Sequence, residues 1–237
     1  MYQANQIVAG VLSLLKEETR PGVTTHYLDT VAEEYCRNHG AVPAFKGYRG
    51  FPASLCASVN EQVVHGIPSK KTILKEGDIL SVDFGTLYQG FYGDSAITLP
   101  VGNISPEIEY LLQVTRESLD KGIEEVRIGN RVSDISRAVQ KHAEENGFFV
   151  VRQFVGHGIG SQLHEAPEVP NYVTRQSSPR LIEGMVLAIE PMVNMGTEKV
   201  IVLQDQWTVV TEDRKPSAHF EHTVAVTKQG PRILSQR

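Results

Sequence analysis

Apolar residues recur every three or four positions in four stretches of the chain, which is the spacing of an amphipathic helix. The predicted helices span residues 4–18, 25–40, 106–126 and 133–146. Thr24 or Thr25 is the expected N-cap of the second helix, and Ser105 is that of the third. Residues 42–53 are predicted to form a loop and residues 54–64 an extended segment. The pattern therefore indicates two helical pairs, one in each half of the chain.

After the first helical pair, apolar and polar residues alternate, as they do in a β-strand with one buried face. Within Glu76–Asp94, Asp83 shares a strand face with Ser81, and Asp94 shares one with Ala96. Larger apolar residues occupy the opposite faces. The alternation predicts two adjoining strands, joined by a turn, that present carboxylates beside small side chains.

The acid-bearing pattern occurs a second time. Residues 183–190, EGMVLAIE, match residues 76–83, EGDILSVD, and residues 220–226 resemble residues 93–99. A constant spacing of 107 residues separates four pairs of positions: Gly22 and Gly129, Gly40 and Gly147, Gly77 and Gly184, and Asp83 and Glu190. We therefore expect one α+β domain, residues 1–237, built from half-domains of approximately 1–105 and 106–237 with pseudo-twofold symmetry. A curved sheet would surround a central site, with the helices outside.

The two copies together supply four acids, each at the end of one strand or the start of another: Asp83, Asp94, Glu190 and Glu221. Carboxylates gathered on nearly buried faces would have strongly raised pKa values unless a cation neutralised them. His157, isolated between glycines in VGHGIG, is the fifth candidate ligand, since glycine permits close backbone approach. Two Asp, two Glu and one His favour a pair of Mn, Fe, Co or Zn ions. Such a pair would lower the pKa of a shared water, as in metal-dependent hydrolases.

These residues also allow other interpretations. The four acids could lie on the surface, on unrelated edge strands, since Asp and Glu are usually exposed. VGHGIG could be a phosphate-binding loop, but no Lys-Ser/Thr follows it. His164-Glu165 does not begin an HExxH helix, because Pro167 interrupts it. A thiol hydrolase built on Cys56 and His65 would lack a third, orienting group.

Composition narrows the class of protein further. The 237 residues are 41% hydrophobic and 22% charged, with a formal net charge of −5, which argues against nucleic-acid and anionic-membrane surfaces. No apolar window is long enough to span a bilayer, and the N-terminal residues do not resemble a signal peptide. Cys36 and Cys56 form no disulfide framework. These features lead us to expect a cytoplasmic protein.

Seven segments, in this order and spacing, resemble type I methionine aminopeptidases over nearly the whole chain: VNEQVVHGIP, LSVDFG, GFYGDSAITL, VGHGIG, LHE, IEPM and FEHTVAVT. The resemblance implies a pita-bread fold, with a curved antiparallel sheet around a central dinuclear metal site. It also implies that Asp83 holds one metal ion, that His157 and Glu190 hold the other, and that Asp94 and Glu221 bridge them.

The resemblance further implies how the site would act. Glu190 would be the general base or proton shuttle, and His65 and His164 would contact the substrate and stabilise the tetrahedral intermediate. A metal-bridging hydroxide would attack the peptide bond after an initiator methionine that is followed by a small residue. The free α-amine would ligate a metal, so a formylated amine would not be accepted. The expected partners are N-terminal methionines of peptides and nascent chains, and a monomer that contacts the ribosome transiently is expected.

By the same resemblance, five residues would line the methionine pocket: Tyr48, Phe51, Cys56, Phe154 and Trp207. The alternative for each is a plain core position. Two positions depart from the family pattern, because Leu163 stands where an aromatic residue is common and Arg49 where a histidine often sits.

Two rival classes share the expected fold. Xaa-Pro dipeptidases and aminopeptidase P enzymes have the same metal set, but they usually carry an additional N-terminal domain, for which residues 1–40 are too few. A metal-free binding module of this fold would be expected to have lost ligands, and none of the five is missing here.

Overall fold

The two predicted helical pairs are present in the computed structural model, which describes residues 1–175 and 177–236. The helices are α1 Tyr2–Glu18, α2 Thr25–Asn38, α3 Pro106–Glu124 and α4 Val132–Glu145. The hydroxyl of Thr24 accepts a hydrogen bond from the Tyr27 amide at 3.1 Å, and that of Ser105 accepts one from the Ile108 amide at 3.4 Å. These are side-chain N-caps, which satisfy amides at the start of each helix. The predicted helices are confirmed, with their ends shifted by at most two residues.

The main sheet has nine strands among the described residues, and its ladders are antiparallel. Its central order is β1-β4-β5-β14-β9-β7-β8, with β2 paired to β4 and β15 paired to β14. These nine are β1 Val42–Pro43, β2 Cys56–Val59, β4 Ile79–Tyr88, β5 Phe91–Pro100, β7 Gly156–Gly158, β8 Glu165–Val169, β9 Val186–Ile189, β14 Glu221–Thr227 and β15 Gly230–Ile233. There are two smaller three-stranded sheets among the described residues. One consists of β6 Phe149–Val150, β10 Met192–Asn194 and β13 Ser217–His219. The other consists of β3 Gln62–Val64, β11 Val200–Val202 and β12 Val209–Thr211.

Three local predictions differ from the structure. The predicted loop 42–53 contains β1 and a short 3₁₀ turn, Tyr48–Gly50. The segment 54–64 is two strands rather than one, because β2 pairs with β4 whereas β3 pairs with β12 of another sheet. Asp83 and Asp94 lie inside β4 and β5 rather than at their ends, since the hairpin continues to a turn at Gln89 and Gly90.

The expected duplication is visible in backbone contacts as well as in element lengths. Both ends of α2 and of α4 are separated by 107 residues. The Gly22 amide donates to the Leu74 carbonyl at 2.8 Å, and the Gly129 amide donates to the Leu181 carbonyl at 3.1 Å. Each pair of positions again lies 107 apart, so the two halves fold by the same local hydrogen bonds.

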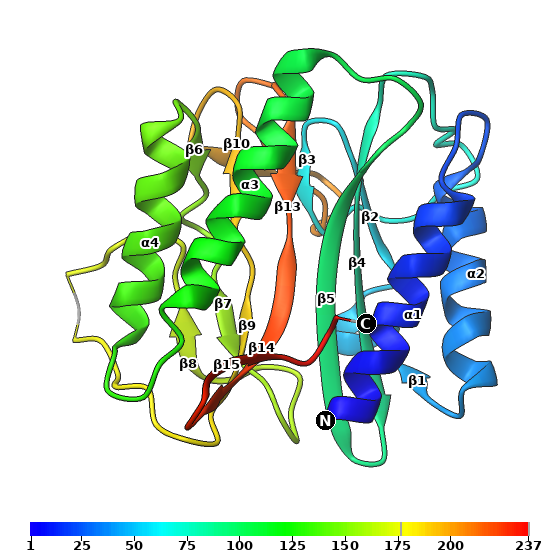
Figure 1. Cartoon of the computed structure of the whole chain (residues 1–237). Helices are drawn as coiled ribbons and strands as arrows, with labels where there is room; N and C mark the ends of the chain where they lie inside the picture. Colours follow the sequence, from blue (N-terminus) through cyan, green and yellow to red (C-terminus); the bar gives the residue numbers. More distant parts are fainter. Residues whose placement is uncertain (176, 237) are drawn as a thin grey trace.

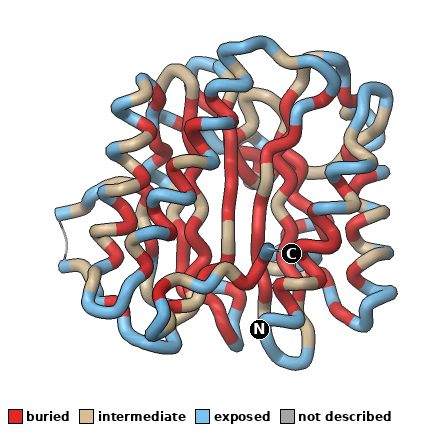
Figure 2. Tube along the Cα trace, in the orientation of Figure 1, coloured by how far each residue is buried: buried red, intermediate tan, exposed pale blue. Residues whose placement is uncertain are grey.

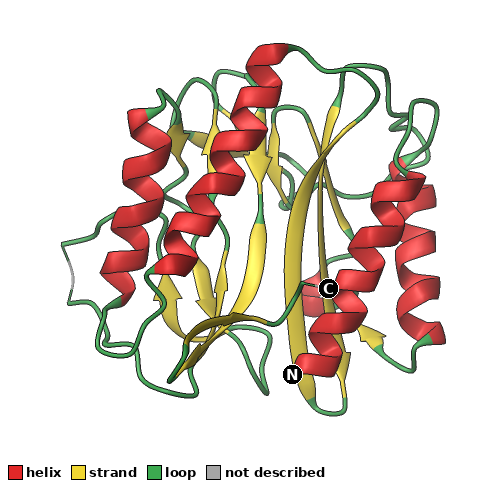
Figure 3. Ribbon diagram, viewed as in Figure 1, coloured by secondary structure: helices red, strands yellow, loops and turns green. Residues whose placement is uncertain are grey.

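All four helices cover one face of the curved sheet (Figures 1 and 3). α1 packs on β4 and β5 around Leu12, Leu28 and Phe84, while α3 packs on β9 and β14 around Leu111 and Leu187. Buried residues follow the strands and the inner sides of the helices, and exposed residues follow the outer sides (Figure 2). No helix among the described residues is both long and apolar enough to cross a membrane.

The halves meet where β5 pairs with β14. Glu221 is in register with Ala96, and His222 is in register with Ser95. The Ser95 hydroxyl donates to the Glu221 carbonyl at 2.6 Å, and the Thr223 hydroxyl donates to the Asp94 carbonyl at 2.7 Å. The joint between the halves therefore holds acids from both copies close together.

Glu33 of α2 anchors the loop that leads into β2. Its carboxylate accepts hydrogen bonds from Arg37 at 2.8 Å, Lys46 at 2.7 Å and the Ser54 hydroxyl at 2.7 Å. Partial burial by itself would raise the pKa of Glu33, but these three donors outweigh it and hold the pKa at about 2. A lowered pKa in the folded state stabilises the fold above the unfolded value near 4.5.

We therefore expect Glu33→Gln to lower the free energy of unfolding at pH 7 by about 1 kcal/mol. The wild-type protein should lose this contribution as pH falls from 4.5 toward 2, so the two proteins converge in acid. Urea unfolding at several pH values measures the difference. Glu124→Gln, which removes an exposed ion pair with Lys121, is the control and should show no such convergence. A pH-independent difference for Glu33→Gln would contradict the prediction.

Candidate metal centre and substrate pocket

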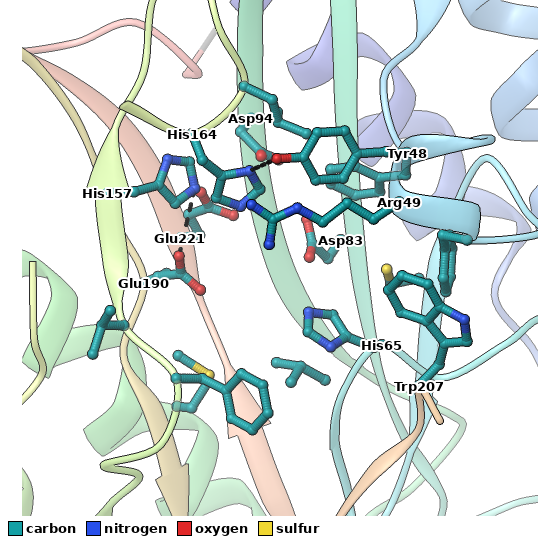
Figure 4. A pocket seen from close by; sticks show the side chains of 18 residues that line it. Tyr48, Arg49, His65, Asp83, Asp94, His157, His164, Glu190, Trp207 and Glu221 are labelled. Carbon is teal, nitrogen blue, oxygen red and sulfur yellow. Dashed lines mark hydrogen bonds and ion pairs between the residues drawn. The ribbon is translucent and has the colours of Figure 1, made fainter. Parts of the chain in front are cut away.

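One cavity, with a volume of about 280 Å³, brings the predicted functional residues together (Figure 4). All five predicted metal ligands line it: Asp83, Asp94, His157, Glu190 and Glu221. The other predicted site residues also line it: Tyr48, Phe51, Cys56, His65, Phe154, His164 and Trp207. The alternative of four scattered surface acids is therefore wrong.

Strand register explains why the acids converge. Ala96 of β5 lies opposite Asp83 of β4 on one side and opposite Glu221 of β14 on the other. Residues directly opposite each other in a ladder project from the same face. The small Ala96 side chain therefore lies between two carboxylates and leaves space in front of them. In the same way, Ala188 of β9 lies opposite both His157 and Thr223.

The ligand atoms are close enough to share cations. Single donor atoms of Asp94, His157 and Glu221 all lie within 4.8 Å of one another. The His157 Nε2 atom is 3.7 Å from Glu190 Oε1. Asp83 is not part of this group of three residues, but its negative charge contributes to raising the pKa of Asp94.

The protein alone does not stabilise the negative charges of these carboxylates. Burial raises the pKa values of Asp83 and Glu190 to about 7. Burial, followed by repulsion from neighbouring acids, raises those of Asp94 and Glu221. Within the described part of the chain, Asp83 Oδ1, Asp94 Oδ1 and Glu221 Oε1 are buried without a hydrogen-bond partner. Buried oxygens without partners, in a set of hard anionic donors, fit divalent cations.

Glycines on both sides of His157 let its strand pack tightly between two others. A Cβ atom on Gly156 would lie 2.4 Å from the Ala188 carbonyl oxygen, and one on Gly158 would lie 2.4 Å from that of Ala166. The predicted reason for these glycines is confirmed. The His157 Nδ1 atom lies 2.9 Å from the Gly158 carbonyl oxygen, so the ring is oriented with Nε2 toward Glu190. This is the arrangement that orients histidine ligands in metal sites.

The two other predicted histidines have distinct supports. The His164 Nδ1 atom is hydrogen-bonded to the Tyr48 hydroxyl at 2.9 Å, and its ring centroid is 4.2 Å from that of His157. His65 has a left-handed backbone, φ 59°, and its ring meets Phe154 edge-on at 5.5 Å. Burial lowers the pKa of each to about 4, so both are neutral near pH 7. Glu165 begins strand β8, which confirms that His164 is not part of an HExxH helix.

Apolar and aromatic residues form one wall of the cavity. The Phe51 and Trp207 rings meet edge-to-face at 5.2 Å, and Cys56 and Leu163 are buried in the same cluster. The Trp207 amide donates to Asp205 Oδ1 at 2.9 Å, which holds its loop in place. Burial and then the nearby acids raise the pKa of the Cys56 thiol, so a nucleophilic thiolate is disfavoured. This argues against the thiol hydrolase.

Sequence reasoning missed His219. It is buried, and its Nε2 atom lies 3.6 Å from Glu190 Oε2. Counting back two positions from Glu221, with the period of a strand, would have placed His219 on the same face. Phe45, Val64 and Met192 also line the cavity, and no local pattern distinguished them from other apolar residues.

Four carboxylates, two buried and two half-buried, around an imidazole, beside two neutral histidines and an apolar pocket, define a metal-dependent hydrolase. The comparison with protein families gives the same class. The model of metallopeptidase family M24 matches residues 1–228. The chain belongs to metallopeptidase family M24, and is therefore a hydrolase of peptide bonds that uses divalent metal.

Individual relatives agree over the whole chain. A protein of Clostridium perfringens named methionine aminopeptidase is 56% identical over 235 residues, which cover 99% of this chain and 94% of that protein. The crystal structure of methionine aminopeptidase from Thermotoga maritima superposes with a TM-score of 0.98 at 45% identity, covering 100% of this chain and 95% of that one. These matches confirm the pita-bread fold expected from the sequence.

The rival class shares the fold at a greater distance. The Xaa-Pro dipeptidase from Bacillus anthracis matches with a TM-score of 0.78 at 21% identity, and the match covers 59% of that longer chain. Identity this low shows the common architecture alone.

Proposed function

We propose that this chain removes the N-terminal methionine from peptides and nascent proteins, with a preference for a small second residue. The observation that carries the proposal is the position of the apolar wall. Phe51, Cys56 and Trp207 line the same cavity as the acids, so a short apolar side chain can be bound beside the reacting groups. The names of the full-length relatives support the same activity.

Two divalent ions fit the ligand set, because four carboxylates balance their four positive charges. We propose that Asp83 holds one ion, that His157 and Glu190 hold the other, and that Asp94 and Glu221 contact both. When bound, the ions would acidify a water and polarise the scissile carbonyl. Mn, Fe, Co and Zn all accept these donors.

Glu190 is the proposed carrier of the proton. A carboxylate at this position can take a proton from the attacking water and release it to the leaving amine. Its two oxygens face His157 and His219 at 3.7 Å and 3.6 Å, which restricts its orientation. The carboxylate is therefore held in a restricted orientation at the cavity in which the reaction is proposed to occur.

His65 and His164 are the proposed donors to the substrate. Neutral rings can donate one N–H without bringing another positive charge next to the metal ions. The Tyr48 hydroxyl donates to His164 Nδ1 in this proposal, so His164 Nε2 carries the hydrogen that stabilises charge on the carbonyl oxygen. Figure 4 shows both rings at the cavity, on opposite sides of Asp83.

Replacing Tyr48 with Phe should lower kcat/KM for a Met-Ala-Ser peptide about three- to tenfold, because one hydrogen bond that orients His164 is lost. Tyr48 is only partly buried, so the melting temperature should be unchanged. Steady-state kinetics and thermal unfolding measure the two effects. Tyr27→Phe, which removes the hydrogen bond from Tyr27 to Glu18, is the matched control. An unchanged kcat/KM in Tyr48→Phe would contradict the role of this bond.

The activity is tested with metal-reconstituted protein and a Met-Ala-Ser peptide in free and N-formyl forms. We expect cleavage of the free peptide only, since the proposal requires an unblocked amine. Equal rates on both forms would rule out amine recognition. A Gly-Pro peptide compared with Met-Gly-Met separates the rival class, and preference for the proline peptide would overturn the assignment.

We further propose that residues 1–237 act as one catalytic domain, whose half-domains of about 1–105 and 106–237 meet at the β5–β14 junction. The acids lie at that junction, which supports the proposal. A monomer working in the cytoplasm, with transient contact to the ribosome, completes the proposed setting. Gel filtration tests the oligomeric state, and co-sedimentation with ribosomes tests the ribosome contact.

A further inference from the structure

Arg49 is the only Lys or Arg among the described residues that line the cavity. It lies in the 3₁₀ turn between β1 and β2, with a left-handed backbone at φ 49°. Residues with a side chain rarely adopt this conformation. The turn imposes it through hydrogen bonds from the Gly47 amide to the Phe51 carbonyl at 2.8 Å and from the Phe51 amide to the Tyr48 carbonyl at 2.9 Å. The turn thus holds Arg49 in an unfavourable backbone conformation, and the positively charged side chain of Arg49 lines the cavity.

The guanidinium of Arg49 is available for a ligand. In the part of the chain that the structure describes, it makes no hydrogen bond and no ion pair. Its carbon lies 5.4 Å from the centre of the Tyr48 ring, and the residue is exposed. Figure 4 shows the side chain extended toward His164. Since Tyr48 also stacks on His164, with ring centroids 5.3 Å apart, the cation lies beside a group that we propose to contact the substrate.

No acidic side chain in the part of the chain that the structure describes forms an ion pair with Arg49, and the four carboxylates of the cavity are the proposed metal ligands. The guanidinium therefore remains open to an anionic ligand. A planar guanidinium offers paired N–H donors that match a carboxylate. The methionine side chain would occupy the wall at Phe51 and Trp207, so the substrate beyond the cleaved bond must leave through the exposed part of the cavity, where Arg49 lies.

We propose that Arg49 binds a carboxylate on the downstream part of the substrate and so favours peptides that carry one. The carboxylate can come from an acidic side chain at the third or fourth residue, or from the C-terminus of a tripeptide. This inference rests on the proposed function, and it adds a specificity residue for the same reaction.

The test measures kcat/KM for three peptide pairs on each enzyme. Met-Ala-Glu-Gly amide is compared with Met-Ala-Gln-Gly amide, Met-Ala-Gly-Glu amide with Met-Ala-Gly-Gln amide, and Met-Ala-Gln acid with Met-Ala-Gln amide. We expect the wild-type enzyme to prefer the carboxylate in at least one pair about fivefold, which corresponds to about 1 kcal/mol. Arg49→Gln should bring that ratio close to one, and Arg49→Lys should retain part of it, since a lysine keeps the charge but not the paired donors. The pair that responds identifies the source of the carboxylate.

Arg232→Gln is the matched control. Arg232 also lies 5.4 Å from an aromatic ring, that of Tyr2, but it does not line the cavity. The control should keep the wild-type ratios. Each readout is a ratio on one enzyme preparation, so a smaller folded fraction in a variant does not change it. Ratios near one in the wild-type enzyme, or a preference that survives in Arg49→Gln, would overturn the inference. Failure to cleave any of the peptides would instead reject the proposed function itself, and this inference with it.

Discussion

Glu190→Gln should reduce kcat for a Met-Ala-Ser peptide about 10³-fold or more while the protein remains folded. The amide has nearly the shape of the carboxylate but cannot accept the proton of the attacking water. General acid–base groups contribute about 10²–10⁴-fold to rate, and the loss of a charged ligand adds to that effect. Glu190 lies between His157 and His219, whose Nε2 atoms are 3.7 Å and 3.6 Å from its two oxygens.

The measurement is steady-state kinetics at saturating metal, with metal content determined on the same sample. Glu183→Gln, seven residues earlier and in an exposed ion pair with Lys228, is the control and should retain full activity. Turnover within tenfold of wild type at saturating metal would remove Glu190 as the proton carrier. A loss of activity that excess metal fully repairs would limit its role to that of a ligand.

Removal of metal should destabilise the protein at neutral pH by several kcal/mol, because buried like charges are then left unpaired. For a chain of this size, each kcal/mol corresponds to about 2–4 °C in Tm, so we expect a fall of about 5 °C or more after chelation. Re-addition of Mn or Co should restore the Tm. Calorimetry on chelated and reconstituted samples measures both changes.

The pH dependence of the metal-free protein follows from the direction of the pKa shifts. Burial raises the folded-state pKa values of Asp83 and Glu190 to about 7, from ordinary values of 3.8 and 4.5. A raised pKa stabilises the fold below the unfolded value and loses that contribution as pH rises through the folded value. The free energy of unfolding of the metal-free protein should therefore decrease between about pH 4.5 and pH 7. A stability that rises over this range would contradict the buried cluster.

A variant separates repulsion from general damage to the fold. Asp94→Asn removes one of the crowded charges, so the metal-free variant should be more stable than the metal-free wild type at pH 7. With metal present the order should reverse, because a ligand has been lost. If Asp94→Asn is less stable than wild type in both states, the carboxylates do not repel one another as proposed.

Much of the fold could be predicted from local patterns. The four helices depend on apolar spacing and on caps such as Thr24 and Ser105, which act within one turn of chain. The duplication was visible in the sequence because turns that require a positive φ recur 107 residues later, as at Gly22 and Gly129. The division of residues 54–64 into β2 and β3 was not predictable, because it depends on which distant strand each segment pairs with.

The sequence by itself determined which groups could bind metal. Asp and Glu beside small residues on alternating strands, and a histidine between glycines, favour Mn, Fe, Co or Zn as the bound ions. Only the tertiary structure decided that these groups share one cavity, since the register of β5 with β14 places Glu221 beside Ala96 and near Asp94. It also decided that His219 faces Glu190 and that Arg49 reaches the cavity. Such placements depend on contacts between residues far apart in the chain, and local hydrophobic patterns do not specify them.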